Sequence, residues 1–583
     1  MLAIQQIKLF KFCRSILAAS FSCASILGIA ASPYEMLPRP DGKLAYQIIP
    51  IPDGLKAEKD VMISMPDGVL LAANVFRPDM QGRFPVILSM TPYGKDQTPP
   101  MFSPDGLPAP DSYTPFVERV HAHGADIGHM KISVLTPWEA PDPAAWIPHG
   151  YVVIHVDRRG DFKSKGRNPN PVQQGQDIAQ VIAWAARQEW SNGKVGMMGV
   201  SALASNQYFT AALQPAPAAL KAIVPWEGQM DLYRDSAFWG GIPETNFMKR
   251  DVKAALVGVP NERAEKIWAE AINPVANQRM LASAAKVEQI QVPTLLCASW
   301  TDKGLHTRGT FEAFRRIGTS DKWLYTHGGR KWERFYSEDA VATQKKFFDY
   351  YLKGVENGWT ETPRVRLEVR ETRDEYTVRF EKSFPLERTN YQRLYLDGRS
   401  GALITKVPKM ATVSYMAQQG GDASFGISFA HDTEITGYIR SKLWVTAKNA
   451  DDMDLFVVVK KFDVNGNEVQ FRGMNGFGGD VAAKGQMRVS QRELDPKLST
   501  SWQPVQKFAG EQKLKPGSMV EVDIALLPSS TLFRAGESLR FYIQGRHPTI
   551  QPLLFYDSTV NKGAHQVQTG GRFASYIELP VIP

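Results

Sequence analysis

Apolar residues recur in short continuous runs through the first 330 residues, and stretches with helical spacing separate several of them. The runs have the length and apolar content of strands buried on both faces, and they span residues 84–94, 150–160, 194–201, 220–226, 292–300 and 321–327. Within 172–190, Val181 and Ile182 follow Ile178 by three and four positions, which is the spacing of residues on one face of a helix. Strands that alternate with helices predict an α/β domain with a doubly wound, mostly parallel sheet.

Two regions depart from this alternation. Residues of about 227–288 contain no strand-like run and are rich in Ala and Lys, which predicts a helical cap inserted over the strand ends. Beyond residue 360 the chain changes to short β-rich segments separated by turn residues, a texture typical of a β-sandwich or jelly roll. We therefore predict an α/β domain over 31–360 and a β-sandwich (jelly-roll) domain over 361–583.

Composition narrows the class of protein. With 583 residues, 43% apolar and 22% charged, the chain is long enough for two or three folded domains. The formal net charge is +8, but basic and acidic residues are interleaved and no recognition motif accompanies them, so we predict no nucleic-acid partner. Cys297 is the one cysteine outside the first 30 residues, which excludes a disulfide framework and a thiolate metal cluster. No cofactor or metal is predicted, although His121, His123 and His129 have metal-like spacing.

The N-terminus has the order of a secretory signal. Lys8, Lys11 and Arg14 precede an apolar run over 15–31 that closes with small residues at Gly28 and Ala30. The alternative is a membrane anchor, but the run contains four serines and is short for a span of about 20 residues. We predict a signal peptide over 1–30, a periplasmic or secreted location, and no stable membrane span after cleavage.

A candidate nucleophile lies where the run 194–201 gives way to an Ala-rich, helix-compatible stretch. A serine on a sharp strand-to-helix turn exposes its hydroxyl, and the next backbone N–H, that of Ala202, points at the developing oxyanion. The familiar pattern G-x-S-x-G places glycine two residues after the serine, where this chain has Leu203. The small residues needed at a close strand–helix approach are Ala202 and Ala204. The alternative is that Ser201 simply caps the helix.

The segment "WSNGKVGMMGVSALASNQ" closely resembles the W-x-N-G-K-V-G-M-x-G-x-S-Y-x-G segment of the CocE/NonD family, the cocaine esterase and X-Pro dipeptidyl-peptidase family of serine hydrolases. Further matches are "MPDGVLLAANVFRP", "TPYGK", "DRRGDFKSKG", "KKFFDYYLKG" and "MDLFVVVKKFDVNG". The resemblance implies an α/β-hydrolase fold, a cofactor-independent serine hydrolase and an acyl-enzyme intermediate. In that family the glycine follows the serine by three residues, where Ala204 stands here, and a tyrosine usually occupies the position of Ala202.

The remaining site residues come from loops after later strands. In α/β-hydrolases the chain order is serine, acid, histidine. Asp302 follows the run 292–300 at the position of the family's W-x-D acid, and His327 ends the run 321–327. The rival His306 is only four residues from Asp302, so we expect it on the same helix and unable to reach Ser201. The resemblance also assigns Tyr93 as the phenolic oxyanion donor; without the resemblance, Tyr93 is better interpreted as a packed aromatic.

These features predict an exported serine hydrolase with a Ser201–His327–Asp302 triad that cleaves an ester or amide of a small molecule or short peptide. An X-Pro dipeptidyl aminopeptidase or amide acylase is the alternative, since Glu227, Asp231 and Asp235 could recognise an amine. Gly304 and Leu305 replace the acidic residues that follow the triad acid in α-amino acid ester hydrolases, which argues against that branch. A carbohydrate- or surface-binding protein with an inactive hydrolase core is the alternative from another class.

Overall fold

The computed structural model describes residues 46–96, 130–246, 281, 283–474, 479–548, 554–557 and 559–583. The predicted signal peptide, the three histidines with metal-like spacing and most of the predicted cap lie outside the described residues. Within the described part, none of the helices is long and apolar enough to cross a membrane.

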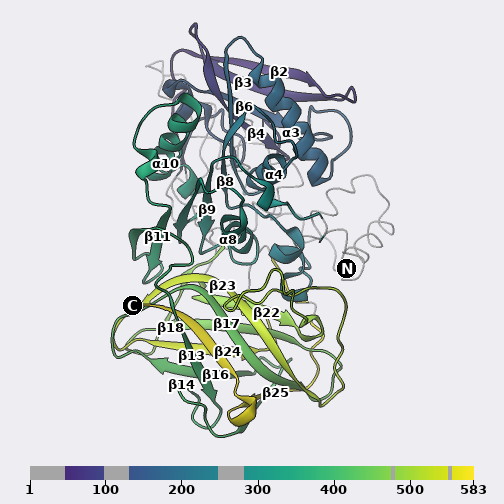
Figure 1. Ribbon diagram of the computed structural model, residues 1–583, viewed down its shortest axis with the longest axis vertical. Helices are drawn as coiled ribbons and strands as arrows, with labels where there is room; N and C mark the ends of the chain where they lie inside the picture. Colours follow the sequence, from purple (N-terminus) through teal and green to yellow (C-terminus); the bar gives the residue numbers. More distant parts are fainter. Residues whose placement is uncertain are drawn as a thin grey trace, which may run out of the picture.

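A ten-stranded sheet forms the centre of the first domain (Figure 1). Its strands, in spatial order, are β2 (Leu55–Ser64), β3 (Leu70–Pro78), β6 (Val152–Asp157), β4 (Phe84–Thr91), β7 (Ser191–Val200), β8 (Leu220–Trp226), β9 (Thr294–Ser299), β10 (Lys322–His327), β11 (Val365–Arg370) and β12 (Tyr376–Glu381). The strands from β6 to β11 are parallel, and the pairs at both edges are antiparallel. The predicted mostly parallel sheet is confirmed, and Ser201 follows a central strand. The predicted domain boundary at residue 360 is too early, because β11 and β12 extend this sheet to Glu381.

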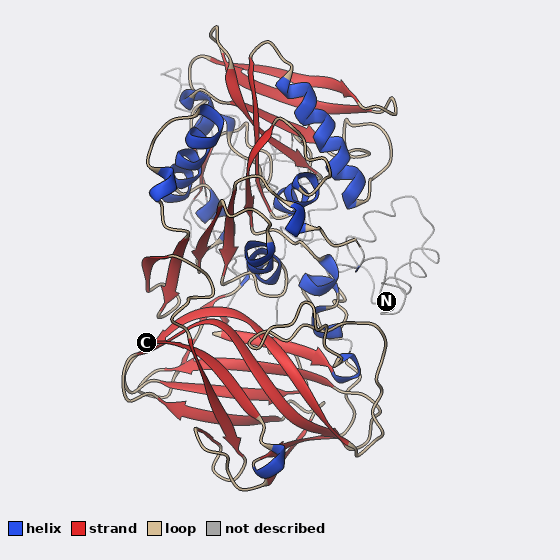
Figure 2. Ribbon diagram, in the orientation of Figure 1, coloured by secondary structure: helices blue, strands red, loops and turns tan. Residues whose placement is uncertain are grey.

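Helices cover both faces of this sheet (Figure 2). One face packs against α3 (Pro171–Ala186), α4 (Ala202–Ala211) and α8 (Thr307–Arg316), and the other against α10 (Glu338–Phe348) and η5 (Asp349–Lys353). The strands supply both cores by alternation: Val86 and Leu88 of β4 point to the first face, and Ile87 between them points to the second. This double burial explains why the strands appear in the sequence as continuous apolar runs.

The described part of the predicted cap is short and irregular. It contains η2 (Tyr233–Ala237), η3 (Trp239–Gly241) and η4 (Val287–Gln289). The helical character expected for the rest of 227–288 therefore stays a prediction.

The C-terminal domain is β-rich and consists of two sheets. One contains β13 (Asn390–Asp397), β14 (Ala402–Ile404), β15 (Ala411–Met416), β17 (Thr433–Ala447), β23 (Met519–Phe533), β25 (Ala564–Thr569) and β26 (Tyr576–Ile582). The other contains β16 (Asp422–Ser428), β24 (Ser538–Gln544), β18 (Asp454–Phe462), β19 (Glu468–Val469) and β22 (Ala483–Arg488). Leu443 of the first sheet and Val457 of the second belong to one buried cluster, as in a sandwich.

The two domains share part of their core at the end of the first sheet (Figure 1). Trp239 and Leu305 of the first domain belong to the same buried cluster as Phe456, Leu527 and Tyr556 of the second. The loop that follows β9, which carries the predicted acid Asp302, lies at this junction, because the Lys303 ammonium donates to the Val481 carbonyl oxygen at 2.7 Å.

Candidate active site

Ser201 occupies a sharp turn between β7 and α4. Its backbone angles are φ 58° and ψ −114°, a region that non-glycine residues seldom adopt and that recurs at functional sites. The backbone N–H of Ser201 donates to the Trp226 carbonyl oxygen at 3.0 Å, and its side chain makes no capping hydrogen bond to the helix. The structure thus disfavours the alternative that Ser201 serves only as a helix cap.

Close packing around the turn explains the residues that flank the serine. A Cβ added at Gly199 would lie 2.5 Å from the Leu203 Cβ, and one at Gly228 would lie 3.0 Å from the Ala204 Cβ. Leu203 is buried with 1% exposure, so the position that is glycine in the familiar pattern holds a core side chain here. The two glycines that allow the close approach stand before the serine and in the loop after β8.

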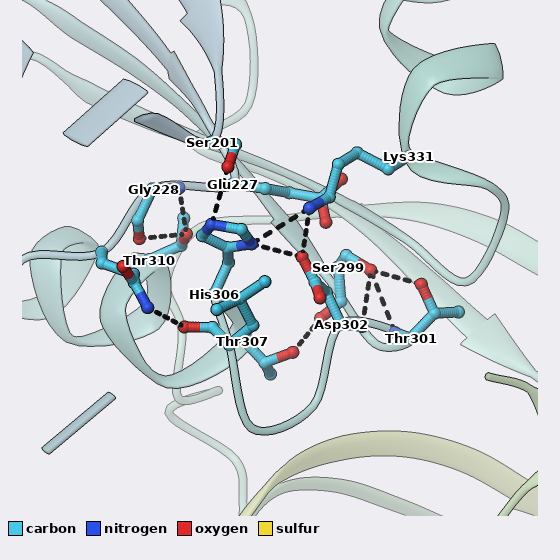
Figure 3. A network of polar contacts seen from close by, with 12 residues as sticks. Ser201, Glu227, Gly228, Ser299, Thr301, Asp302, His306, Thr307, Thr310 and Lys331 are labelled. Atoms are coloured by element: carbon cyan, nitrogen blue, oxygen red, sulfur yellow. Dashed lines mark hydrogen bonds and ion pairs between the residues drawn. The ribbon is translucent and has the colours of Figure 1, made fainter. Parts of the chain in front are cut away.

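The histidine that contacts Ser201 is His306. Its Nε2 lies 3.1 Å from the Ser201 Oγ, and its Nδ1 is hydrogen bonded to the Asp302 carboxylate (Figure 3). Both Asp302 and His306 are almost completely buried. Ser201 and Asp302 are therefore brought together through an imidazole, in the arrangement that acyl transfer requires.

The expectation that His306 cannot reach the serine is wrong: residues 303–306 form a turn that precedes α8, and this turn brings the His306 ring to both Asp302 and Ser201. The backbone N–H of His306 donates to the Asp302 carbonyl oxygen at 3.2 Å, and α8 begins only at Thr307. The Thr307 hydroxyl donates to the Ser299 carbonyl oxygen at 2.8 Å and fixes the end of the turn. The turn lies beyond β9, two strands from β7, and of its side chains His306 is the one that contacts the serine.

The structure does not bring His327 to Ser201, which corrects our assignment of the contact. His327 is the last residue of β10, is fully buried, and lies with its Nε2 3.0 Å from the Glu227 Oε1. Its ring stacks on Trp226, with centroids 6.2 Å apart. Burial, with Arg334 nearby, lowers the pKa of His327 to about 3, so its imidazole is neutral at ordinary pH.

Lys331 is a further member of the cluster that we did not predict. It is the first residue of α9 (Lys331–Phe335), and its Nζ lies 2.5 Å from the Asp302 Oδ2 and 3.0 Å from the His306 Nδ1 (Figure 3). Burial alone would raise the pKa of Asp302, but the charge of Lys331 and the contact with His306 outweigh it, so this pKa is held below its usual range. Asp302 is therefore ionised.

The two predicted oxyanion donors, Ala202 and Tyr93, lie after and before Ser201 in the sequence. Ala202 is the first residue of α4, so its N–H has no acceptor within the helix. Tyr93 lies in the loop after β4, and its hydroxyl acts, against burial, to lower the pKa of the Glu139 carboxyl. The Glu139 carbonyl oxygen accepts the N–H of Val200, the residue before the serine, at 3.0 Å.

Backbone strain concentrates here. Ser201, Glu139 and Glu227 are three of the six non-glycine residues with positive φ in the described part of the chain. Glu139 and Glu227 are both buried, and burial raises the pKa of each. Among the described residues, no group of three or more His, Cys, Asp or Glu side chains is arranged to hold a metal ion.

One sequence signal could have identified His306: an acid and a histidine four residues apart directly after a buried strand. No comparable signal marks Lys331, Glu139 or Glu227, because each comes from a different loop and meets the others only in the folded chain.

Family models match both domains. The model of the X-Pro dipeptidyl-peptidase (S15 family) matches residues 67–284, and that of the X-Pro dipeptidyl-peptidase C-terminal non-catalytic domain matches 357–578. The first match includes the turn at Ser201 but ends before Asp302 and His306.

Comparisons with individual proteins support the same family. A CocE/NonD family hydrolase from Staphylococcus aureus is 38% identical, with a TM-score of 0.82 over 91% of this chain and 94% of that one. The cocaine esterase of Rhodococcus sp. (strain MB1 Bresler) is 26% identical over 401 residues, which are 59% of this chain and 62% of that enzyme. An aminopeptidase from the marine sediment archaeon Thaumarchaeota archaeon, at 16% identity and a TM-score of 0.65, shares the fold.

Proposed function

Because the chain belongs to the CocE/NonD family of serine hydrolases, we propose that it cleaves an ester or amide bond through an acyl-enzyme on Ser201. His306 is the general base and Asp302 the carboxylate that orients it. The observation that carries this assignment is the chain of contacts from the Ser201 Oγ through the two ring nitrogens of His306 to Asp302.

Each group has one task in this mechanism. The Ser201 hydroxyl gives its proton to His306 Nε2 as its oxygen attacks the substrate carbonyl, and Asp302 stabilises the imidazolium that forms. The imidazolium then protonates the leaving group. A water molecule, deprotonated in turn by His306, attacks the acyl-enzyme and releases the acid. Burial and the nearby Lys331 lower the pKa of His306 despite Asp302, so the ring is neutral and ready to accept a proton.

The Ala202 N–H and the Tyr93 hydroxyl are the proposed donors to the oxyanion. The N–H sits at the start of α4, where the helix leaves it without an internal partner. The Tyr93 hydroxyl, which acts to lower the pKa of the buried Glu139 carboxyl, is assigned the second hydrogen bond to the oxyanion. Because Ala202 carries no large ring, the acyl side of the site stays open next to the serine.

An ester or amide without a free α-amino group fits the site better than an aminopeptidase substrate. Asp231 pairs with Arg234 at 2.8 Å, and Asp235 pairs with Arg308 at 2.6 Å. Glu227 contacts His327. All three carboxyls are buried, so each acidic residue that kept amine recognition open already has a partner. This supports the esterase reading over the dipeptidyl aminopeptidase reading.

The test compares the two histidines directly. Purified protein is incubated with a fluorophosphonate probe, the adduct is mapped by mass spectrometry, and turnover of short p-nitrophenyl esters is measured. We expect Ser201→Ala and His306→Gln to lose labelling and at least about 10³-fold in kcat. The matched variant His327→Gln, where it is folded by circular dichroism, should keep both within about tenfold.

Labelling of His306→Gln at the wild-type rate, with loss in folded His327→Gln, would restore the histidine predicted from the sequence. Absence of any labelling or hydrolysis in the wild-type protein would instead favour the binding-protein reading.

A further inference from the structure

Lys331 stands out because a buried ammonium has been placed directly against the proposed base. Its side chain is only 3% exposed, and desolvating a charge is costly unless the charge is paired. Its closest partners are the Asp302 carboxylate and the His306 ring nitrogen. The other carboxyls that act on its charge are Glu227 and Glu139, both of which belong to the same site. Each of these carboxyl partners of Lys331 thus belongs to this site.

The groups around His306 can be ordered by contact. Asp302 Oδ2 and Lys331 Nζ both face Nδ1, and the Ser201 hydroxyl faces Nε2. The Glu227 carboxyl acts on the ring from a greater distance. For Nε2 to accept the serine proton, Nδ1 must carry the hydrogen and donate it to Asp302. The Lys331 ammonium then cannot donate to Nδ1 and donates to Asp302 instead. Its positive charge repels a second proton on the His306 ring.

From this arrangement, which rests on the triad proposed above, we infer that Lys331 is a positioning residue that holds the Asp302 carboxylate against His306 and keeps the imidazole unprotonated before substrate attack. His306 Nδ1 and Lys331 Nζ both contact the same oxygen, Asp302 Oδ2, so the Lys331 contact helps to hold this oxygen against the ring. The positive charge of Lys331 also disfavours protonation of the His306 ring until the serine proton is transferred. At that moment the oxyanion that forms nearby offsets the added positive charge.

The sign of the effect follows from the charge. His306 is active as a base only when neutral, so activity falls as the pH falls through its pKa. Lys331 lowers that pKa, and its removal must raise it. We expect the acid limb of kcat/KM in Lys331→Gln to move to higher pH by about one unit, because the nearest cation has gone. Lys331→Arg keeps the charge and should keep the wild-type limb.

The measurement is the pH dependence of Ser201 labelling by the fluorophosphonate together with that of kcat/KM. Lys331→Gln retains a donor for Asp302, and Lys331→Met serves as a second uncharged variant where the first is unstable. Arg330→Met is the matched control, since it removes the neighbouring cation, which pairs with Glu333 at 2.8 Å. Its acid limb should not move.

Two results would overturn the inference. An unmoved acid limb in folded Lys331→Gln or Lys331→Met rejects the role of Lys331 while leaving the triad intact. A shift of equal size in Arg330→Met shows a general charge effect and also rejects it. Failure of the triad itself has a different signature, namely wild-type labelling of His306→Gln, and it removes the basis of the inference as well.

Discussion

At the scale of single residues, Glu139 combines a strained backbone with a buried carboxyl. Its φ is 65°, its carbonyl oxygen holds the strand before Ser201, and its Oε1 accepts the Trp332 indole N–H at 3.1 Å. Burial raises its pKa to about 7, although Lys331 and the indole act in the opposite direction. Such strain persists only where the surroundings impose it, and here they position the turn that carries Ser201, the proposed nucleophile.

This buried acid makes stability depend on pH. Between its unfolded value of 4.5 and its folded value of about 7, Glu139 binds a proton in the folded state and releases it on unfolding. Its contribution is therefore fully present below pH 4.5 and is lost as the pH rises, by up to about 1.4 kcal/mol per unit. We expect Glu139→Gln to gain stability relative to wild type from pH 5 to 7 in urea unfolding. Parallel curves would contradict this, and the exposed Glu338→Gln is the control.

At the scale of elements, the contact of β7 with α4 decides the shape of the nucleophile turn. Leu203 lies over Gly199, and Ala204 lies over Gly228, so the helix approaches the sheet closely at two points. Leu203 takes part in the core although it follows the serine by only two residues. Leu203 thus stands in place of the glycine of G-x-S-x-G because its side chain packs in the core, and the turn at Ser201 is still sharp.

Restoring the familiar pattern should damage the protein. Leu203→Gly removes a buried side chain and adds a glycine to the first turn of α4, and we expect it to lose about 3 kcal/mol or more of unfolding free energy. The volume-conserving Leu203→Met should lose less than about 1.5 kcal/mol. Urea unfolding of both variants at pH 7 measures the difference. A glycine variant as stable as the methionine variant would refute the packing explanation.

At the scale of the whole molecule, the C-terminal domain supports the loop that carries Asp302. Lys303, the next residue, is fully buried, with its Nζ 3.4 Å from the Asp480 Oδ2. Asp480 also lies 3.5 Å from Lys484, so one carboxylate compensates two buried ammonium groups. A domain without the proposed triad residues therefore fixes the position of one of them through its neighbour.

Removal of the Asp480 charge should affect both domains. We expect Asp480→Asn to lose about 3–5 kcal/mol of stability, because it removes the carboxylate that pairs with two buried lysines. Turnover by its folded fraction should also fall, since the Asp302 loop loses an anchor. The control Glu468→Gln breaks a half-buried pair with Lys460 and should cost under about 1 kcal/mol. Unfolding monitored by tryptophan fluorescence measures the loss of stability, and kcat measures the effect on the site. An unchanged kcat in folded Asp480→Asn would show that the C-terminal domain does not position the Asp302 loop for turnover.

The sequence by itself determined the buried strands of the first domain and their mostly parallel sheet, but not its last two strands, β11 and β12, which lie beyond the predicted boundary. Strands buried on both faces must be continuously apolar, and helices between them must be amphipathic, so residues 84–94 or 172–190 could be assigned locally. It also pointed to Ser201 and Asp302 as candidates, because each follows a recognisable strand. Export through residues 1–30 and the helical cap stay predictions.

Only the tertiary structure decided which histidine meets the serine. His306 lies in the turn between β9 and α8, and His327 ends β10. The four-residue spacing of Asp302 and His306 points to a contact between these two, but it does not show which imidazole faces Ser201. The choice depends on side-chain direction: residues 303–306 turn beyond the sheet toward the serine, whereas His327 remains inside it beside Glu227. Burial and the contacts between residues 100 or more positions apart, as in the pairs Ser201–His306 and Glu227–His327, are properties of the folded chain.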